Sequence, residues 1–365
     1  MKIQDITSFL ENIAPVQLQE NYDNAGLITG DFNWECTGVI TSLDCTEEVV
    51  MEAVSKNCNL IIAHHPIVFG GLKKITGKNY VERTVIAAIK NNIAIYAIHT
   101  NLDNVIQGVN GKMADMLGLE KRTILQPKNE QLKKLSVFVP VEHAEKIRQA
   151  IFENGAGHIG NYSECSFNVT GDGTFRAGDA ANPFVGKVGE RHTESEIKIE
   201  SVFPAWAERN ILKALIKAHP YEEVAYDIYR LDNTFSSVGS GIIGYLPVEL
   251  NEADFLQKLK TAFGLQLVKH TQLRGKKVKK VALCGGAGSF LIKTSIAAGA
   301  DFYVTSDIKY HEFFDADGRM VLADIGHYES EQHTIDLLFD ILKEKFHNFA
   351  VQKTGIRTNP VYYFL

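Results

Sequence analysis

The sequence predicts an α/β protein with a two-lobed core, residues 1–127 and 241–365, and a ferredoxin-like domain inserted over residues 128–240. Short apolar strands alternate with helices at both ends of the chain, which is typical of a largely parallel sheet. The middle of the chain has a different order of strands and helices. Polar or Gly- and Ser-rich stretches flank it at residues 126–131 and 236–241. These observations favour one core that is interrupted by a separate module.

In the first part of the chain, apolar residues at helical spacing alternate with short apolar runs. Thr46 is in position to cap a helix, because its hydroxyl can accept a hydrogen bond from the helix N-terminus. Functional side chains of such folds gather just beyond the carboxyl ends of the strands. The expected elements are helices over residues 3–13, 47–56 and 81–91 and strands over residues 37–43, 60–63 and 95–98.

The inserted segment contains two strand–helix halves around a Gly- and Ser-rich hairpin region, residues 155–190. The resulting order, βαββαβ, is that of a ferredoxin-like module. Its expected elements are strands over residues 134–139, 196–203 and 224–231 and helices over residues 143–154 and 205–218.

After residue 241 the first pattern resumes, and no short repeat is evident. The lobe built from this part should again carry strands in its interior and helices on its faces. The expected elements are strands over residues 279–283, 302–305, 320–323, 349–352 and 361–365 and helices over residues 290–298 and 329–345.

Length and composition place the chain among ordinary globular proteins. Its 365 residues are enough for two or three domains, and 45% of them are hydrophobic, so the chain can bury a core. A net charge of −6 argues against broad nucleic-acid binding, which needs a basic surface. With no signal-peptide pattern and no apolar run long enough for a membrane span, we expect a soluble, cytoplasmic protein. Five scattered cysteines without a CxxC pair fit reduced thiols.

The tripeptide His64-His65-Pro66 directly follows the predicted strand 60–63. Successive strand residues point to opposite faces, so two adjacent imidazoles do not easily bind one ion. At a strand end they can serve two ions that lie side by side. Pro66 keeps His65 extended and holds both imidazoles out of a helix. The tripeptide therefore indicates a metal site, although a single such motif is equally consistent with a structural role.

Further ligands follow two other predicted strands. Asp103 lies in a segment after strand 95–98 and offers a carboxylate that can bridge two ions. His327 and Glu331 follow strand 320–323 and are four residues apart, so they share one face of a helix. Together with His64 and His65, candidate ligands thus follow three predicted strands. This pattern predicts a di-metal centre with coordination left open for water or substrate. The predicted ligands are His64, His65, Asp103, His327 and Glu331.

Other motifs carry weaker predictions. His99 and His311 are candidate proton relays, although a structural role explains each of them at least as well. The loop 284–289 follows a strand and opens a helix, but it lacks the GxGxxG spacing and the Walker lysine. We interpret it as a tight turn, with nucleotide contact as the lesser alternative. The segment 219–223 is best explained as a helix stop, and no GxSxG motif suggests covalent catalysis.

Six motifs in the two outer lobes are similar to those of the GTP cyclohydrolase I type 2 homologues, also called the NIF-three-like family. Together they are highly specific, although each alone is not. The middle segment resembles the insert of the longer bacterial members, which is similar to PII and CutA modules. The matching motifs are Asn21–Leu27, Ser42–Thr46, Ala63–Pro66, His99–Asp103, Thr305–His311 and Gly326–Glu331.

This resemblance implies a dinuclear site with the same five ligands, and all five positions carry the expected residue type. It also implies a toroidal homohexamer in which the metal sites face an internal cavity and the inserts cap the ends. A set of imidazole and carboxylate ligands suits two divalent ions, with zinc as the first expectation and iron or manganese as alternatives.

Two functions follow from these patterns. The first is a metal-dependent hydrolase that acts on a small N-heterocyclic or phosphorylated substrate through a metal-bridging water, with His99 or His311 relaying protons. The alternative is a non-catalytic regulatory or metal-handling protein whose PII-like insert senses a ligand or partner. The sequence shows no guanine or triphosphate pocket that would decide between them.

Overall fold

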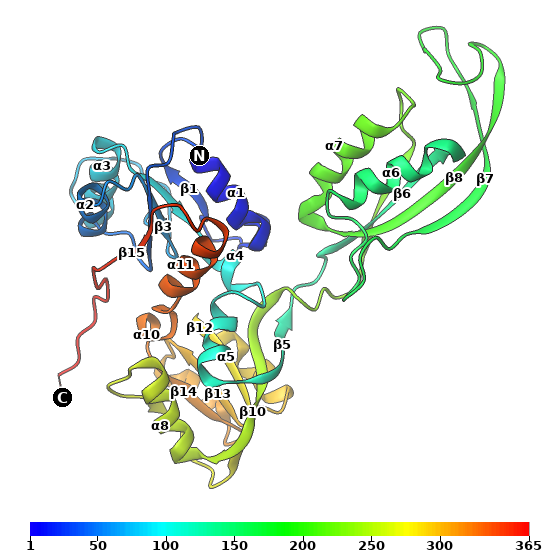
Figure 1. The fold of residues 1–365 in the computed structure, drawn as a ribbon. Helices are drawn as coiled ribbons and strands as arrows, with labels where there is room; N and C mark the ends of the chain where they lie inside the picture. The colour runs from blue at the N-terminus through cyan, green and yellow to red at the C-terminus, as the bar shows by residue number, and fades with distance from the viewer. Residues whose placement is uncertain (365) are drawn as a thin grey trace. The chain divides into compact units, whose positions relative to one another are not determined.

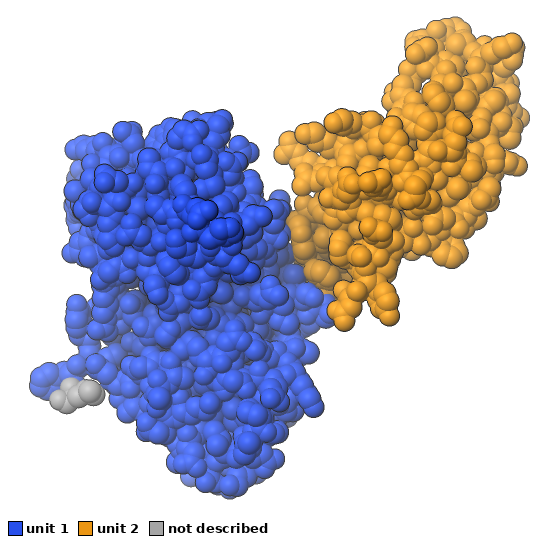
Figure 2. All heavy atoms as spheres, viewed as in Figure 1, with its two compact units in different colours: residues 1–127, 236–365 blue, residues 128–235 orange. Residues whose placement is uncertain are grey.

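A computed structural model describes residues 1–364 of the chain. They form two compact units, unit 1 with residues 1–127 and 236–365 and unit 2 with residues 128–235 (Figure 1). Figure 2 shows the atoms of unit 1 in blue and those of unit 2 in orange. Along residues 1–364, no helix has both the length and the hydrophobicity to cross a membrane.

The first sheet of unit 1 joins strands from both ends of the chain (Figure 1). Its strands are β1 (Gly26–Thr29), β2 (Val39–Ser42), β3 (Leu60–Ala63), β4 (Ala94–Ala97) and β15 (Val351–Lys353), in the order β1-β4-β3-β2-β15. All neighbours are parallel except β1, which runs antiparallel to β4. Its associated helices are α1 (Ile3–Ile13), α2 (Glu47–Ser55), α3 (Tyr80–Lys90) and the short α4 (Thr100–Asp103).

Alternation along the strands decides which helices cover which face of this sheet. Ile40 and Ile61 pack in one cluster with buried residues of α2 and α3. On the other face, Tyr96 donates a hydrogen bond to Glu11 of α1. The predicted cap of α2 is confirmed, because the Thr46 hydroxyl accepts from the N–H of the third helical residue.

The end of the chain corrects two sequence predictions. The helix expected over residues 329–345 is two helices, α10 (His327–Glu331) and α11 (Thr334–Lys345). Between them, the Gln332 side chain donates to the carbonyl of Phe263. The break allows α11 to pack against β2 and β15 of the first sheet, where the carbonyl of Ile335 accepts from Thr41. The last strand therefore belongs to the first sheet, although we assigned its residues to the second lobe.

The strand expected over residues 361–365 is absent from its described part, residues 361–364, and Leu365 lies outside the described residues. Pro360 has no N–H to donate, and the N–H of Val361 donates instead to the Asn359 side chain. Two neighbouring donors are thus unavailable for a strand ladder.

The second sheet of unit 1 has the order β11-β14-β13-β12-β10-β5, and β12, β13 and β14 are parallel. β5 lies within the first 127 residues and partly overlaps the expected linker 126–131, so the two lobes exchange elements. β10 likewise begins inside the expected linker 236–241, because Gly239 pairs with Pro127. The strands are β5 (Glu120–Pro127), β10 (Gly239–Asn251), β11 (Lys269–His270), β12 (Lys277–Ala287), β13 (Phe302–Ser306) and β14 (Val321–Asp324).

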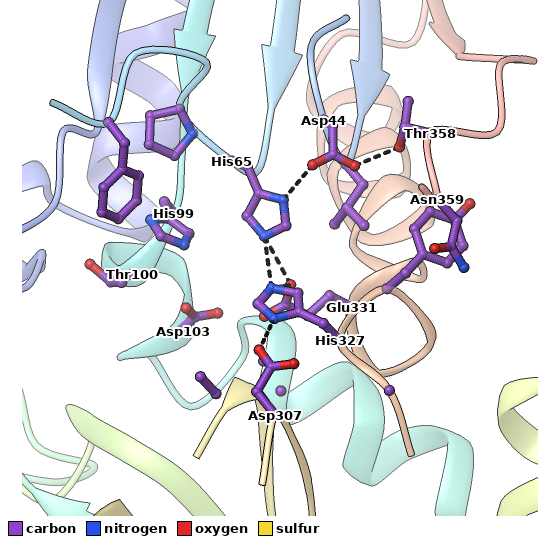
Figure 3. Close-up of a pocket in the computed structure, with 18 of the residues that line it drawn as sticks. Asp44, His65, His99, Thr100, Asp103, Asp307, His327, Glu331, Thr358 and Asn359 are labelled. Atoms are coloured by element: carbon purple, nitrogen blue, oxygen red, sulfur yellow. Dashed lines mark hydrogen bonds and ion pairs between the residues drawn. The ribbon is translucent and has the colours of Figure 1, made fainter. Parts of the chain in front are cut away.

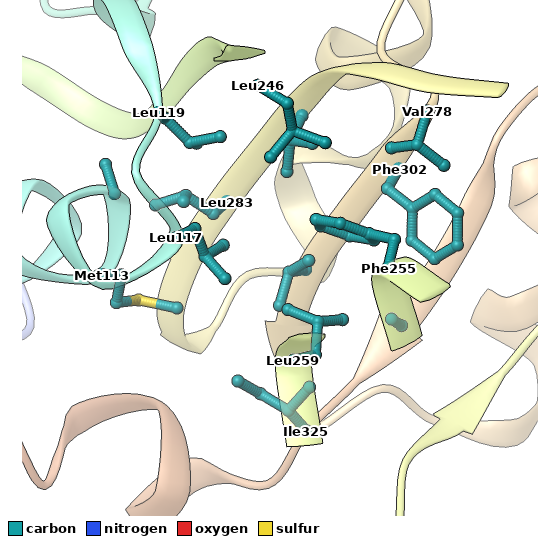
Figure 4. Packing of buried hydrophobic residues seen from close by; sticks show 14 of the residues in the cluster. Met113, Leu117, Leu119, Leu246, Phe255, Leu259, Val278, Leu283, Phe302 and Ile325 are labelled. Carbon is teal, nitrogen blue, oxygen red and sulfur yellow. The ribbon is translucent and has the colours of Figure 1, made fainter. Parts of the chain in front are cut away.

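A large hydrophobic core lies between this second sheet and the helices α5 (Val109–Leu117) and α8 (Glu252–Phe263). Figure 4 shows Phe255 of α8 beside Phe302 of β13, and their ring centroids are 4.8 Å apart in an edge-to-face arrangement. A second cluster includes Tyr303 and residues of α9 (Ile292–Ala297). Burial on both faces explains why these strands are nearly continuous apolar runs.

Unit 2 has the predicted ferredoxin-like topology. Its strands follow the sheet order β7-β8-β6-β9, and all neighbours are antiparallel. His219 stops the second helix, and its Nε2 donates to the carbonyl of Phe138, as the structural interpretation of this segment expected. The elements in chain order are β6 (Leu132–Pro140), α6 (Ala144–Phe152), β7 (Phe167–Arg176), β8 (Arg191–Pro204), α7 (Glu208–Ala218) and β9 (Tyr226–Leu231).

Candidate metal centre

The predicted ligands from the first part of the chain follow two neighbouring parallel strands. His64 and His65 come directly after β3, where their N–H groups donate to the carbonyls of Ser42 and Leu43. Asp103 lies on α4, which follows β4. Because β3 and β4 are parallel, these side chains meet at one edge of the first sheet. Figure 3 shows His65 and Asp103 there.

The other two predicted ligands come from α10. Gly326, which precedes this helix, has a φ of 92°, and a Cβ there would lie 2.3 Å from Oε2 of Glu329. Only glycine therefore fits this close turn. His327 and Glu331 lie one turn apart on α10, and Figure 3 shows both beside His65.

The structure brings all five predicted ligands together around the carboxylate of Glu331. Its Oε2 lies 3.0 Å from His65 Nε2 and 3.1 Å from His327 Nε2. Its Oε1 lies 3.9 Å from His64 Nε2, which is 3.7 Å from Asp103 Oδ1. Glu331 thus faces two groups of candidate ligands, one with His64 and one with His65, and a third group of suitable spacing brings both histidines together with His99.

Both groups have spacings that suit a bound cation. Within each group, the ligand atoms lie within 4.8 Å of one another. Around a tetrahedral ion with bonds of about 2.1 Å, neighbouring ligand atoms are about 3.4 Å apart. His64 Nε2 and Asp103 Oδ1 are also buried, and among residues 1–364 neither has a hydrogen-bond partner. Such burial is costly, and a cation between these atoms would remove the cost, so the residues fit the implied metal.

Each of the three predicted histidine ligands binds an acceptor through Nδ1, its other ring nitrogen. These contacts place the Nδ1 proton outward and turn each Nε2 toward Glu331, so that an Nε2 that has lost its proton would present its lone pair to a cation, as metal-binding histidines do. The pairs are His64 Nδ1 with the carbonyl of Ile98 at 2.9 Å, His65 Nδ1 with Asp44 at 2.8 Å, and His327 Nδ1 with Asp307 at 2.6 Å.

The sequence analysis did not identify Asp44 and Asp307 as partners of the ligands. Both occur in the motifs quoted above, and each follows the carboxyl end of a parallel strand, β2 or β13. That position is the signal that could have assigned them to the site. Asp307 also has a φ of 57°, a left-handed conformation that is uncommon outside glycine.

Charge in the centre is strongly coupled. Burial alone would lower the pKa of His65 and of His327. Hydrogen bonds to carboxylates outweigh burial and raise the pKa of His65 to about 10 and that of His327 to about 11. Burial and the neighbouring Glu331 raise the pKa of Asp103 well above its usual value. The hydrogen bonds from the histidines hold the pKa of Glu331 low despite its burial. Protons therefore occupy the places that cations would take.

The glycines at the end of β12 form one wall of the centre. A Cβ on Gly286 would lie 2.4 Å from Glu331 Oε1, and Gly286 has a φ of 62°. Its N–H donates to the hydroxyl of Ser330 at 3.0 Å. The tight turn expected over residues 284–289 is wrong for residues 284–287, which are the end of β12, where the left-handed Gly286 accompanies a shift in the pairing with β13. The backbone at Gly286 lies directly against the shared carboxylate.

His99, one of the two candidate proton relays, lies at the edge of the centre. Its ring centroid is 5.2 Å from that of His64 and 5.3 Å from that of His65. Its Nδ1 pairs with Asp23 at 2.7 Å, and Asp23 also accepts from the N–H of Thr100. These hydrogen bonds outweigh burial and lower the pKa of Asp23 to about 2, so the carboxylate is ionised and orients the ring.

His311, the other candidate relay, does not reach the centre. It lies in a short 3₁₀ helix, Tyr310–Ala316, and is exposed, with its ring against those of Tyr310 and Phe314. It is not among the described residues that line the cavity. The same motif instead contributes Asp307, because the chain turns away from the site after that residue.

The centre opens into a cavity of about 1450 Å³ within unit 1. The exposed aromatic residues on its wall include Tyr22 and Phe69, whose rings are stacked with centroids 6.2 Å apart. Phe69 also presents its ring to His99 at 5.8 Å in an edge-to-face arrangement. The cavity thus combines ionisable groups at its base with apolar surface beside them, as small-molecule sites do.

Comparisons with known proteins agree with this architecture. A family model described as Duf34/NIF3 (NGG1p interacting factor 3) matches residues 1–360. A protein of Halalkalibacterium halodurans named "GTP cyclohydrolase 1 type 2 homolog" is 39% identical over 98% of this chain and 97% of its own length. A Bacillus subtilis protein with the same name is 40% identical over 89% of this chain and 88% of its own.

Solved structures show the same fold. A Bacillus cereus protein related to NIF3 superposes with a TM-score of 0.86 at 38% identity, covering 100% of this chain and 99% of that one. The Staphylococcus aureus protein SA1388 superposes with a TM-score of 0.78 at 29% identity and the same coverage. The resemblance noted from the motifs is therefore confirmed over nearly the whole chain.

Proposed function

Because the chain belongs to the Duf34/NIF3 family, we propose that it is a metal-dependent hydrolase that holds two divalent cations around Glu331. One ion would bind His64, Asp103 and Glu331, and the other would bind His65, His327 and Glu331. The observation that carries this proposal is that the two oxygens of one buried carboxylate face two different ligand groups. When bound, two such ions would supply Lewis acidity and would lower the pKa of water in the cavity.

The metal is zinc in this proposal, with iron or manganese as alternatives. Three imidazole nitrogens and two carboxylates form a mixed donor set, and such sets accept all three metals. Described protein atoms provide few donors for each ion, so the proposed site leaves positions open on the cavity side, as catalytic sites do.

His99 is the proton relay in this mechanism. The buried Asp23 carboxylate holds His99 Nδ1, which leaves Nε2 free to take a proton from a reacting group and return it to a leaving group. His311 is not part of the mechanism, because the structure places it outside the cavity wall.

The proposed substrate is a small N-heterocyclic or phosphorylated compound. The stacked rings of Tyr22 and Phe69 support a planar ring, and the cationic centre would support an anionic or electron-rich group. The name of the curated relatives suggests the same class, but it describes those proteins. We also propose, from the family resemblance alone, that the chain works in the cytoplasm as a homohexamer.

The test is a substrate screen with metal-loaded protein. Zinc-loaded protein is incubated with nucleotides and phosphoesters, and His64→Ala and Glu331→Gln should both abolish any turnover. His311→Ala is the matched control, since it removes an imidazole outside the cavity wall and should leave the activity unchanged. Turnover that survives both ligand substitutions would overturn the mechanism.

The regulatory alternative has a test of its own. Unit 2 has a separate hydrophobic core, so the chain can be cut at the boundaries of residues 128–235. A hydrolase should keep its turnover after this excision. Loss of ligand or partner binding, in a protein that has no turnover to lose, would favour the regulator.

A further inference from the structure

The segment after β15 reaches the metal centre from the end of the chain. We call residues Thr354–Tyr363 the C-terminal strap, and they form no regular secondary structure. The strap is attached to α2 at its start, where the N–H of Gly355 donates to Glu52 Oε1 at 2.8 Å. Further along, Thr358 and Asn359 lie on the wall of the same cavity as four of the five predicted ligands, all except His64.

Thr358 contacts the carboxylate that orients His65. Its hydroxyl donates to Asp44 Oδ2 at 2.6 Å, and Asp44 Oδ1 pairs with His65 Nδ1 at 2.8 Å. Figure 3 shows these contacts as one continuous line from the strap to Glu331. With both oxygens bound, the Asp44 carboxylate cannot rotate without losing a hydrogen bond, so Thr358 fixes the direction of the imidazole.

Asn359 contacts the helix that carries the other ligands. Its side chain is buried, with 4% of the residue exposed, and its Nδ2 donates to Glu329 Oε1 at 3.1 Å. Glu329 lies on α10 between His327 and Glu331. Its other oxygen packs against the backbone of the turn that starts this helix. Asn359 therefore holds α10 from the side opposite its ligands.

We propose that Thr358 and Asn359 form a clasp that keeps the two ligand-bearing parts of the centre at the correct separation. One residue of the clasp is bonded to the group behind His65, and the next is bonded to α10. Adjacent Cα atoms are about 3.8 Å apart whatever the rest of the chain does. The clasp thus sets the position of His65 relative to Glu331 before any cation binds, and both are positioning residues. This inference rests on the proposed metal centre.

The test measures cation binding instead of turnover. Co²⁺ is titrated into metal-free protein, and its visible absorption reports both the affinity and the coordination geometry. Thr358→Val keeps the shape of the side chain but removes the hydroxyl, and Asn359→Asp replaces the donor to Glu329 with a repelling oxygen. Loss of a partner behind a metal ligand typically weakens binding by about 10- to 100-fold, and we expect Thr358→Val to fall in this range with an altered spectrum. Asn359→Asp acts on α10 through Glu329 and should also weaken binding and alter the spectrum.

Two controls separate the clasp from general damage. Thr358→Ser restores the hydroxyl and should recover most of the affinity. Tyr362→Ser changes a strap residue that is 84% exposed and should have no effect. Because the two principal substitutions act on different partners, each tests the clasp even if the other variant does not fold. Wild-type affinity and spectra in a folded Thr358→Val or Asn359→Asp variant would overturn the clasp, whereas a wild-type protein that binds no Co²⁺ would overturn the metal centre itself.

Discussion

Glu331 Oε2 lies 3.0 Å from His65 Nε2, although 266 residues separate the two in the sequence. The contact joins the edge of the first sheet to α10, which follows the second sheet. The candidate centre therefore exists only when both sheets of unit 1 are assembled. Its proposed chemistry depends on how firmly this junction is held.

Asp307 should matter to metal binding because it holds His327 through Nδ1 at 2.6 Å. Asp307→Asn keeps the size of the side chain but removes the charge that makes the imidazole a stronger ligand. We expect zinc affinity to fall by about 10- to 100-fold, measured by competition with a chromophoric chelator. Asp315→Asn, at an exposed position in the following 3₁₀ helix, is the control and should bind normally. Equal affinities for the two variants would contradict this role.

Gly286 should be essential to the centre because a side chain there collides with Glu331. Gly286→Ala places a Cβ 2.4 Å from Oε1, whereas Gly264 has the same left-handed backbone, with a φ of 64°, and open space around its Cβ position. Each alanine should cost about 1–2 kcal/mol in unfolding free energy from backbone strain, measured by urea denaturation.

The two glycine variants should differ in metal content. We expect Gly286→Ala to lose bound metal, determined by elemental analysis of protein purified without chelators, and Gly264→Ala to retain it. Full metal content in Gly286→Ala would mean that Glu331 can move aside without leaving the centre.

Metal affinity should increase with pH. In the metal-free protein, hydrogen bonds to carboxylates outweigh burial and keep the pKa of His65 at about 10 and that of His327 at about 11. A cation must displace these protons, so each proton released should raise the apparent affinity by about tenfold per pH unit below those values. Calorimetry in two buffers with different ionisation enthalpies measures the protons released. Binding that releases none between about pH 6 and 8 would be inconsistent with the prediction.

Removal of the metal should lower the stability of unit 1. A ligand that binds only the folded state stabilises it by about 2.7 kcal/mol when its concentration is 100 times Kd. EDTA should therefore lower the melting temperature of the wild type, and it should have little effect on Glu331→Gln. Unit 2 has its own core, so any separate transition of that unit should stay in place. An equal decrease of the melting temperature by EDTA in both proteins would contradict this prediction.

Much of the architecture was predictable because it follows from local pattern. The alternation of apolar strands and helices predicted both α/β lobes, and the order of elements in residues 128–235 predicted the ferredoxin-like topology. The rule that functional side chains follow the carboxyl ends of parallel strands identified Glu331 and the four predicted ligands that gather around it. Their role as ligands stays a prediction, because spacing does not measure binding.

The errors concern contacts between distant segments. We assigned residues 349–352 to the second lobe, but β15 pairs with β2 of the first sheet. His311 follows the end of β13, as a site residue should, yet the left-handed turn at Asp307 directs it into solvent. In both cases the local sequence is compatible with either outcome, and packing elsewhere in the chain selects one of them.

Residue order was thus sufficient for the fold class, the family motifs and the set of candidate ligands, because strands, helices and their ends are specified over a few neighbouring residues. Only the folded chain could reveal the acceptors that bind the Nδ1 atoms of the histidines, the close approach of Gly286 to Glu331 and the contacts of Thr358 and Asn359. These depend on side chains far apart in sequence that approach within about 3 Å, and such proximity arises from the packing of whole elements.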